Sequence, residues 1–113
     1  MSLRHSRLLG HSGIHTSVVG LGCNNCGRRL DIDGTRRVID TARECGVTFF
    51  DTADIYGRGA SEEQLSKLLE GHRDHGVLAT RFGIDMGDGR CPRRVGDYIR
   101  QAAVLLRAGP RSL

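Results

Sequence analysis

Residues 46–57 read GVTFFDTADIYG and join a short apolar segment to a polar loop. The segment 47–50 is β-branched and aromatic, a composition typical of a short buried strand. Asp51 follows it directly, and Tyr56 lies near the end of the loop. In parallel βα proteins the reactive side chains lie at the carboxyl ends of the strands. The stretch therefore predicts a buried strand that holds Asp51 and Tyr56 at such an end.

Two other apolar segments predict strands before and after this one. Residues 18–22 form an apolar run typical of a strand buried on both faces, and residues 77–80 predict a third buried strand. Ahead of them, residues 4–19 predict a hairpin with Gly10 and Gly13 in its turn.

Helical patterns occupy the gaps between the predicted strands. Asp31 or Asp33 is expected to cap a first helix, in which apolar residues recur up to Cys45 before Gly46 supplies a left-handed C-terminal residue. A second helix is predicted from a capping box at 61–64 and an apolar stripe at 65, 68 and 69. A third is predicted over 92–108.

This order of elements predicts an α/β fold. Short apolar strands alternate with helical segments, which is the signature of parallel βα units joined by right-handed crossovers. The third strand ends in VLATRFG and brings Arg81 to the same edge as the loop after the second strand. We therefore expect Asp51, Tyr56 and Arg81 to converge. Taken alone, Asp51 and Asp54 are better explained as carboxylates that cap turns, and Tyr56 as a partly buried surface tyrosine.

The cysteines contain one pair with a recognisable spacing. Cys23 and Cys26 have the C-x-x-C spacing of zinc ribbons and thioredoxin-like sites. A zinc ribbon needs a second such pair, which Cys45 and Cys91 do not form. A redox site needs the motif at the start of a helix, whereas the residues that follow are turn-like. Two reduced loop cysteines, without a metal, are the favoured interpretation.

Length and composition fit one domain over residues 1–113. Hydrophobic residues make up 38% and charged residues 27%, ordinary values for a soluble globular protein. No apolar run approaches the roughly 20 residues of a membrane helix, and the start lacks a secretory signal, so we expect a cytoplasmic protein and no membrane partner. The net charge is +4, but the arginines are scattered and aromatics are few, which argues against nucleic-acid binding.

Four ordered blocks resemble the aldo-keto reductases. These are the N-terminal LG-x-(S/T)-G hairpin, GLGCNNCG, GVTFFDTADIYG and SEEQL. The resemblance covers residues 8–83 well and 92–108 more loosely. It implies a (β/α)8 TIM barrel floored by an N-terminal β-hairpin, of which this chain supplies the first three βα units. It also implies NADPH-dependent reduction of an aldehyde or ketone, and so a small-molecule carbonyl substrate.

The resemblance also assigns roles to residues. Tyr56 stands at the position of the tyrosine that donates a proton to the carbonyl oxygen. A free tyrosine titrates near pH 10, so it needs a positive charge beside it. In the family a lysine, held by an aspartate that matches Asp51, supplies this charge. Here Arg81 occupies the lysine position, and we expect its bulkier, permanently charged guanidinium to lower the rate.

The loop after the first strand borders the nicotinamide in that family. Gly22, Cys23 and Asn24, together with Asp51, are therefore candidates for cofactor contact, while an ordinary barrel turn is an equally good interpretation of the first three. This loop lacks the third glycine of a dinucleotide fingerprint and is not a Rossmann loop.

The length of the chain adds an expectation of its own. A complete barrel takes about 250 residues, so the sequence predicts a truncated barrel with weak or absent NADPH binding, no activity alone, and self-association through an open sheet face. Neither the family's histidine at the end of the fourth strand nor its phosphate-holding loops have a counterpart here. The alternative function is that of a non-catalytic α/β remnant used for binding or self-assembly.

Overall fold

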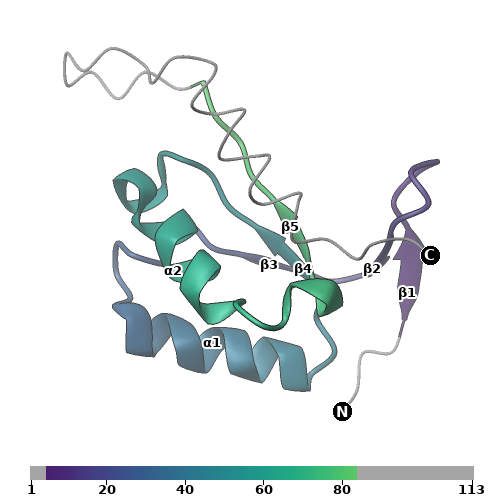
Figure 1. Cartoon of the computed structure of the whole chain (residues 1–113), viewed down its shortest axis with the longest axis horizontal. Helices are drawn as coiled ribbons and strands as arrows, with labels where there is room; N and C mark the ends of the chain where they lie inside the picture. Colours follow the sequence, from purple (N-terminus) through teal and green to yellow (C-terminus); the bar gives the residue numbers. More distant parts are fainter. Residues whose placement is uncertain (1–4, 84–113) are drawn as a thin grey trace.

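The computed structural model describes residues 5–83 of the chain, which form a hairpin and a small α/β layer (Figure 1). The hairpin consists of β1 (Ser6–Leu8) and β2 (His15–Ser17), which pair antiparallel with Leu8 opposite His15. The turn between them contains Gly10 and Gly13, both with positive φ. The predicted hairpin is therefore confirmed.

Three parallel strands follow the hairpin. They are β3 (Gly20–Gly22), β4 (Phe49–Asp51) and β5 (Val77–Ala79), in the order β3-β4-β5. Leu21 pairs with Phe50 and Phe50 with Leu78, so one row of apolar side chains crosses the sheet. The α/β fold class with parallel βα connections is thus confirmed.

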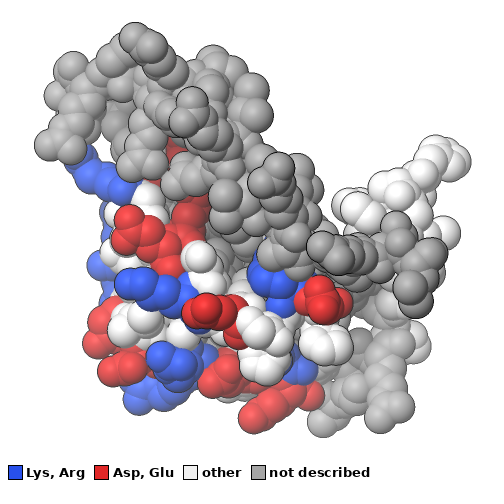
Figure 2. All heavy atoms as spheres, in the orientation of Figure 1, with Lys and Arg blue, Asp and Glu red and all other residues white. Residues whose placement is uncertain are grey.

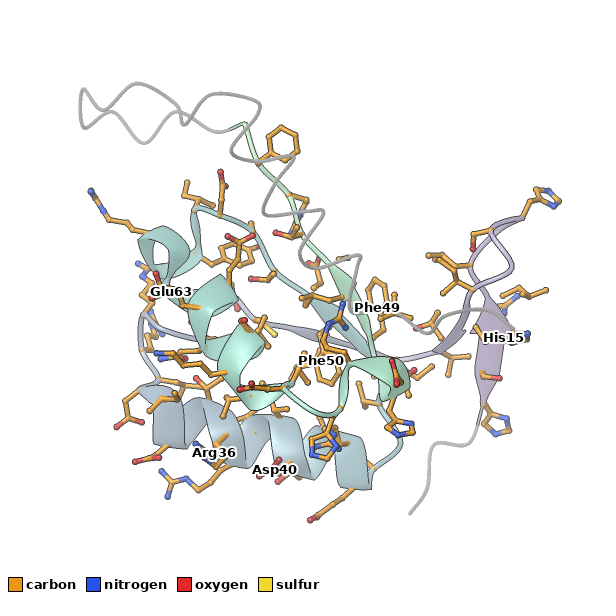
Figure 3. All side chains as sticks on the ribbon, viewed as in Figure 1. His15, Arg36, Asp40, Phe49, Phe50 and Glu63 are labelled. Carbon is orange, nitrogen blue, oxygen red and sulfur yellow. The ribbon has the colours of Figure 1, made fainter. Side chains whose placement is uncertain are left out.

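Two helices cover one face of this sheet (Figure 1). They are α1 (Ile32–Glu44) and α2 (Ala60–Leu68). Phe50 is buried between sheet and helices, and Figure 3 shows Phe49 pointing to the opposite side. Asp51 shares the side of Phe49, because side chains alternate along a strand. The core cluster on the helix side consists of Cys23, Cys26, Ile39, Phe50, Leu65 and Leu69.

Helix α1 begins and ends where its sequence predicts. Asp31, not Asp33, is its N-cap, and the Asp31 carboxylate accepts a hydrogen bond from the Gly34 amide at 2.8 Å. Gly46, just past the helix, has φ of +88°. Arg36 and Asp40 lie on the side that faces away from the sheet (Figure 3). On the face in Figure 2, basic and acidic side chains are interspersed over the helices.

The predicted capping box of α2 is wrong. The N-cap is Gly59, and no side chain caps the helix. The Ser61 hydroxyl instead donates to the Cys23 carbonyl oxygen at 3.0 Å and shares a hydrogen bond with the Thr52 hydroxyl at 2.8 Å. Gln64 accepts a hydrogen bond from Thr35 of α1. Both residues therefore join elements across the core, where partners distant in sequence replace the local cap. The apolar stripe was predicted correctly, since Leu65 and Leu69 are buried.

The strand predicted over 18–22 is also corrected. Only Gly20–Gly22 pair with β4, and Val18 and Val19 are 49% and 45% exposed. These two valines lie where the chain passes from hairpin to sheet, so a partner strand does not cover them. The hairpin is instead tied to the sheet by Ser17 and Thr48, whose backbone amides each donate to the other's hydroxyl.

The helix predicted over 92–108 lies outside the described residues, as does Cys91. Within residues 5–83, no helix has the length and apolar character that a membrane crossing requires.

Candidate active site

The three side chains expected to converge meet at the carboxyl edge of the sheet. Nη2 of Arg81 donates to Oδ2 of Asp51 at 2.8 Å and to Oη of Tyr56 at 2.7 Å. Asp51 is the last residue of β4, Tyr56 begins the short turn η1 (Tyr56–Gly59), and Arg81 follows β5. One guanidinium nitrogen therefore bridges the carboxylate and the phenol. The predicted convergence is confirmed, while the chemical roles stay predictions.

Backbone hydrogen bonds beyond the strand ends hold these residues in place. The Thr52 amide donates to the Ala79 carbonyl at 2.8 Å, and the Asp54 amide donates to the Arg81 carbonyl at 3.0 Å. The Cys23 amide donates to the Asp51 carbonyl at 2.8 Å. The parallel pairing thus continues into the loops, which fixes the spacing between the Asp51 and Arg81 backbones.

The chemistry of arginine decides which group donates in the hydrogen bond between Arg81 and Tyr56. Arginine has only N–H donors, so the Tyr56 oxygen must accept from Arg81. The Tyr56 O–H proton is then left to donate elsewhere. The Arg81 carbon Cζ also lies 5.8 Å from the centre of the Tyr56 ring. A cation beside the phenol oxygen stabilises the negative charge that remains when the proton leaves.

This ion pair contributes little to folding. The side chains of Arg81 and Asp51 are 60% and 37% exposed. Exposed ion pairs are worth about 0–1 kcal/mol. The stability of the fold therefore does not explain why a carboxylate, a phenol and a guanidinium share one point at this edge.

The loop after β3 approaches the same edge of the sheet. Its residues differ in how much of their side chains is accessible there. Gly22 pairs with Asp51 across the sheet, and a Cβ atom built on it would have no neighbour within 4 Å. Asn24 is exposed. The Cys23 side chain, in contrast, is fully buried in the core. Of the three cofactor contacts predicted in this loop, Cys23 therefore presents no side chain at the edge.

Cys23 and Cys26 are both free thiols and both buried. Burial raises the pKa of Cys23 from 9.0 to about 12, and the adjacent Cys26 and the charge of Asp51 add to the shift. Reactive cysteines have a lowered pKa, so this environment opposes a redox role. Both residues lie in the loop after β3 and are free thiols, as the sequence indicated, but their side chains are buried in the core.

A pocket of about 810 Å³ lies beside Tyr56. Two loops line it, and Tyr56 belongs to both the pocket and the hydrogen-bond network. Among residues 5–83, the pocket is lined by Asn24, Gly27, Arg28, Ile55, Tyr56, Gly57 and Arg58. Most of these were missed from the sequence, because Arg28 and Arg58 are 30 positions apart and belong to no motif. The signal that could have found them is that both follow predicted strands in the same parallel sheet.

Fold and site together define a class of protein. A parallel βα sheet with a tyrosine, a carboxylate and a cation at its carboxyl edge, beside a pocket, has polar side chains where α/β proteins carry their functional residues. The model of the aldo/keto reductase family matches residues 18–103. The chain belongs to the aldo/keto reductase family.

Individual relatives agree with the family match. The uncharacterized oxidoreductase YqkF of Bacillus subtilis is 37% identical over 83 residues, which are 74% of this chain and 26% of that protein. The crystal structure of PA4992, a putative aldo-keto reductase from Pseudomonas aeruginosa, has a TM-score of 0.75 at 32% identity and covers 95% of this chain. The holo form of aldo-keto reductase AKR11C1 from Bacillus halodurans has a TM-score of 0.74 at 30% identity over 90% of this chain.

The chain is much shorter than these relatives. It spans about a quarter of the length of the curated relative, and 43% and 36% of the two solved chains. The family match over residues 18–103 contains the three parallel strands and the site at their carboxyl edge.

Proposed function

We propose that Asp51, Tyr56 and Arg81 form part of an NADPH-dependent reductase site that converts an aldehyde or ketone to an alcohol. The observation that carries the proposal is the double hydrogen bond from Arg81 to Asp51 and Tyr56. It orients the phenol and leaves the Tyr56 proton available for the carbonyl oxygen of a substrate. NADPH, when bound, supplies the hydride for the carbonyl carbon.

In this proposal each residue has one task. Tyr56 donates its proton to the developing alkoxide, and Arg81 stabilises the phenolate that remains. Asp51 positions the guanidinium through the 2.8 Å hydrogen bond. Gly22 and Asn24 are the proposed contacts for the nicotinamide end of the cofactor. The open space above Gly22, next to Asp51, is compatible with a flat ring at that edge.

The family places the loops that hold the cofactor phosphates later than the residues described here. We therefore expect the 113-residue chain alone to bind NADPH weakly or not at all and to show no turnover. This expectation can be checked directly by titrating the chain with NADPH and following the fluorescence of the reduced nicotinamide.

A chimera tests the assignment of roles. Residues 18–83 would replace the matching segment of the Bacillus halodurans enzyme, whose fold this chain shares. The chimera should oxidise NADPH when a carbonyl substrate is added. Tyr56→Phe should lower kcat by about 100-fold to 10,000-fold, the usual contribution of a general acid.

Thr41→Val is the matched control for this experiment. It also removes one hydroxyl, but from the exposed part of α1, where Thr41 donates only to the Arg37 carbonyl. Its kcat should stay unchanged. A folded, NADPH-binding chimera in which Tyr56→Phe keeps full activity would refute the proposed role of Tyr56.

A further inference from the structure

The first turn of α2 forms hydrogen bonds to the residue that directly follows each strand of the parallel sheet. These three residues are Cys23 after β3, Thr52 after β4 and Thr80 after β5. The Ser61 hydroxyl donates to the Cys23 carbonyl oxygen at 3.0 Å and lies 2.8 Å from the Thr52 hydroxyl. Glu62, the next residue, accepts from the Thr80 hydroxyl at 2.6 Å. Two consecutive residues of one helix therefore bind the ends of three strands.

The bonds of Ser61 form a chain with one direction. A serine hydroxyl has a single proton, which Ser61 gives to the Cys23 carbonyl oxygen. The Thr52 hydroxyl must therefore donate to the Ser61 oxygen. Thr52 and Ser61 are both fully buried, and a buried hydroxyl is costly unless its hydrogen bonds are made. The chain thus fixes the loop after β3, the loop after β4 and α2 in one arrangement.

The residues bound by α2 are the direct neighbours of the site residues. Thr52 follows Asp51, and Thr80 precedes Arg81. Side chains alternate between the two faces of an extended strand. The hydroxyls of Thr52 and Thr80 accordingly reach the helix, while Asp51 and Arg81 bond to each other. A shift of either threonine would move the backbone of the adjacent site residue.

We propose that Thr52 and Ser61, supported by Thr80 and Glu62, are positioning residues for the reductase site. One nitrogen of Arg81 serves both of its partners, at 2.8 Å and 2.7 Å, so a small displacement would lengthen one of these hydrogen bonds. The first turn of α2 prevents that displacement by fixing the spacing of the strand ends. The catalytic consequence rests on the proposed function, whereas the effect on the Arg81 hydrogen bonds does not.

The first test uses the full chain without cofactor. The NMR signal of the Tyr56 ring carbon Cζ reports on the hydrogen bond that the phenol oxygen accepts. Arg81→Met removes that bond and defines the signal position for its loss. Thr52→Val keeps the shape of the side chain but lacks the hydroxyl, and it should move the Tyr56 signal toward the Arg81→Met position. Thr52→Ser keeps the hydroxyl and should leave the signal in place.

Thr48→Val is the matched control on the same strand. Thr48 directly precedes β4, and its hydroxyl accepts a hydrogen bond from the Ser17 amide at 2.8 Å. Its replacement removes a structural hydrogen bond at the opposite end of β4, so it should lower the urea midpoint and leave the Tyr56 signal unchanged. Ser61→Ala should shift the signal as Thr52→Val does.

The second test separates positioning from substrate binding in the chimera. Thr52→Val should lower kcat by about 10-fold to 100-fold, the usual cost of a slight misplacement of reacting groups, and leave the KM for the carbonyl substrate unchanged. Thr52→Ser should restore kcat, and Thr48→Val should not change it. If Thr52→Val fails to fold, Thr80→Val carries both tests, because Thr80 is only half-buried.

Three results would overturn the inference. These are an unmoved Tyr56 signal in a folded Thr52→Val or Thr80→Val chain, an equal shift in Thr48→Val, and an unchanged kcat in an active chimera. An inactive chimera would refute the reductase proposal, and the Tyr56 signal would still decide the positioning role. An unmoved signal beside an active chimera would refute the positioning role alone.

Discussion

Single side chains account for most of what the sequence reveals about the site. Asp51, Tyr56 and Arg81 could be predicted to meet because each follows a strand of one parallel sheet. Arg28 and Arg58 could not, because their position depends on how two loops fold against each other. The burial of Cys23 was equally hidden, since a cysteine in a C-x-x-C loop looks the same whether its thiol faces water or the core.

Arg81→Lys tests the effect of an arginine at the position where the family has a lysine. The guanidinium reaches both partners through one nitrogen, so a lysine nitrogen at that point would keep both hydrogen bonds. A compact ammonium also exchanges protons, which arginine does not. We expect the substitution to raise carbonyl reduction by the chimera several-fold, measured as NADPH oxidation. Arg36→Lys, on the outer side of α1, is the control and should change nothing. No gain from Arg81→Lys would contradict the assigned role.

Cys23 predicts how stability depends on pH. Its folded pKa of about 12 lies above the ordinary 9.0, so the folded state keeps a proton that the unfolded chain loses. The resulting stabilisation is complete below pH 9 and is lost as the pH rises from 9 to 12. The free energy of unfolding should fall by about 1 kcal/mol per pH unit there, as measured by urea denaturation. Cys23→Ala should flatten this slope, and an unchanged slope would contradict the assignment.

Helices and strands were predicted correctly where neighbouring residues set their ends, and wrongly where distant residues did. Helix α1 followed from its own sequence, because Asp31 and Gly46 act within a few residues of the helix ends. The start of α2 did not, because Ser61 bonds to Thr52 and to the Cys23 carbonyl instead of capping its own helix. The strand predicted over 18–22 is too long. Its apolar residues do not indicate that pairing with β4 begins only at Gly20.

Gly27 should be irreplaceable where the loop after β3 meets the start of α2. A Cβ on Gly27 would lie 2.5 Å from the Ala60 Cβ and 2.7 Å from the Ala60 carbonyl carbon, and its φ is +74°. Gly13 has nearly the same φ, +75°, but its Cβ would meet nothing within 4 Å. Gly13→Ala should therefore cost only the backbone strain, about 1–2 kcal/mol. Gly27→Ala adds the clash and should destabilise the chain more, as measured by urea denaturation. Equal losses would show that Gly27 does not pack against the start of α2 as described.

Residues 5–83 cover the sheet unequally on its two faces. Between residues 5 and 83, the helices lie on one face of the sheet, and the side of Phe49 and Asp51 has no helix of its own (Figure 1). Large apolar side chains are also exposed along the hairpin and its exit, namely Leu8, Leu9, Ile14, Val18 and Val19. In the family this side faces the inside of a closed barrel, as the resemblance implies. The hairpin and sheet thus present apolar surface that the described residues leave uncovered.

We therefore propose that the chain self-associates through this uncovered side, because burial of apolar surface is worth about 25 cal/mol per Å². Sedimentation velocity should show a mass that rises with protein concentration. Val19→Lys, at the exit of the hairpin, should shift the chain toward the monomer, because association would bury the new charge. Val38→Lys makes the same change on α1, on the helical layer, where valine is 37% exposed, and should leave the association unchanged. A single monomeric species at every concentration, with cooperative unfolding, would refute association through the sheet. If Val19→Lys and Val38→Lys dissociate the chain equally, the dissociation is caused by the added charge and not by the position of Val19.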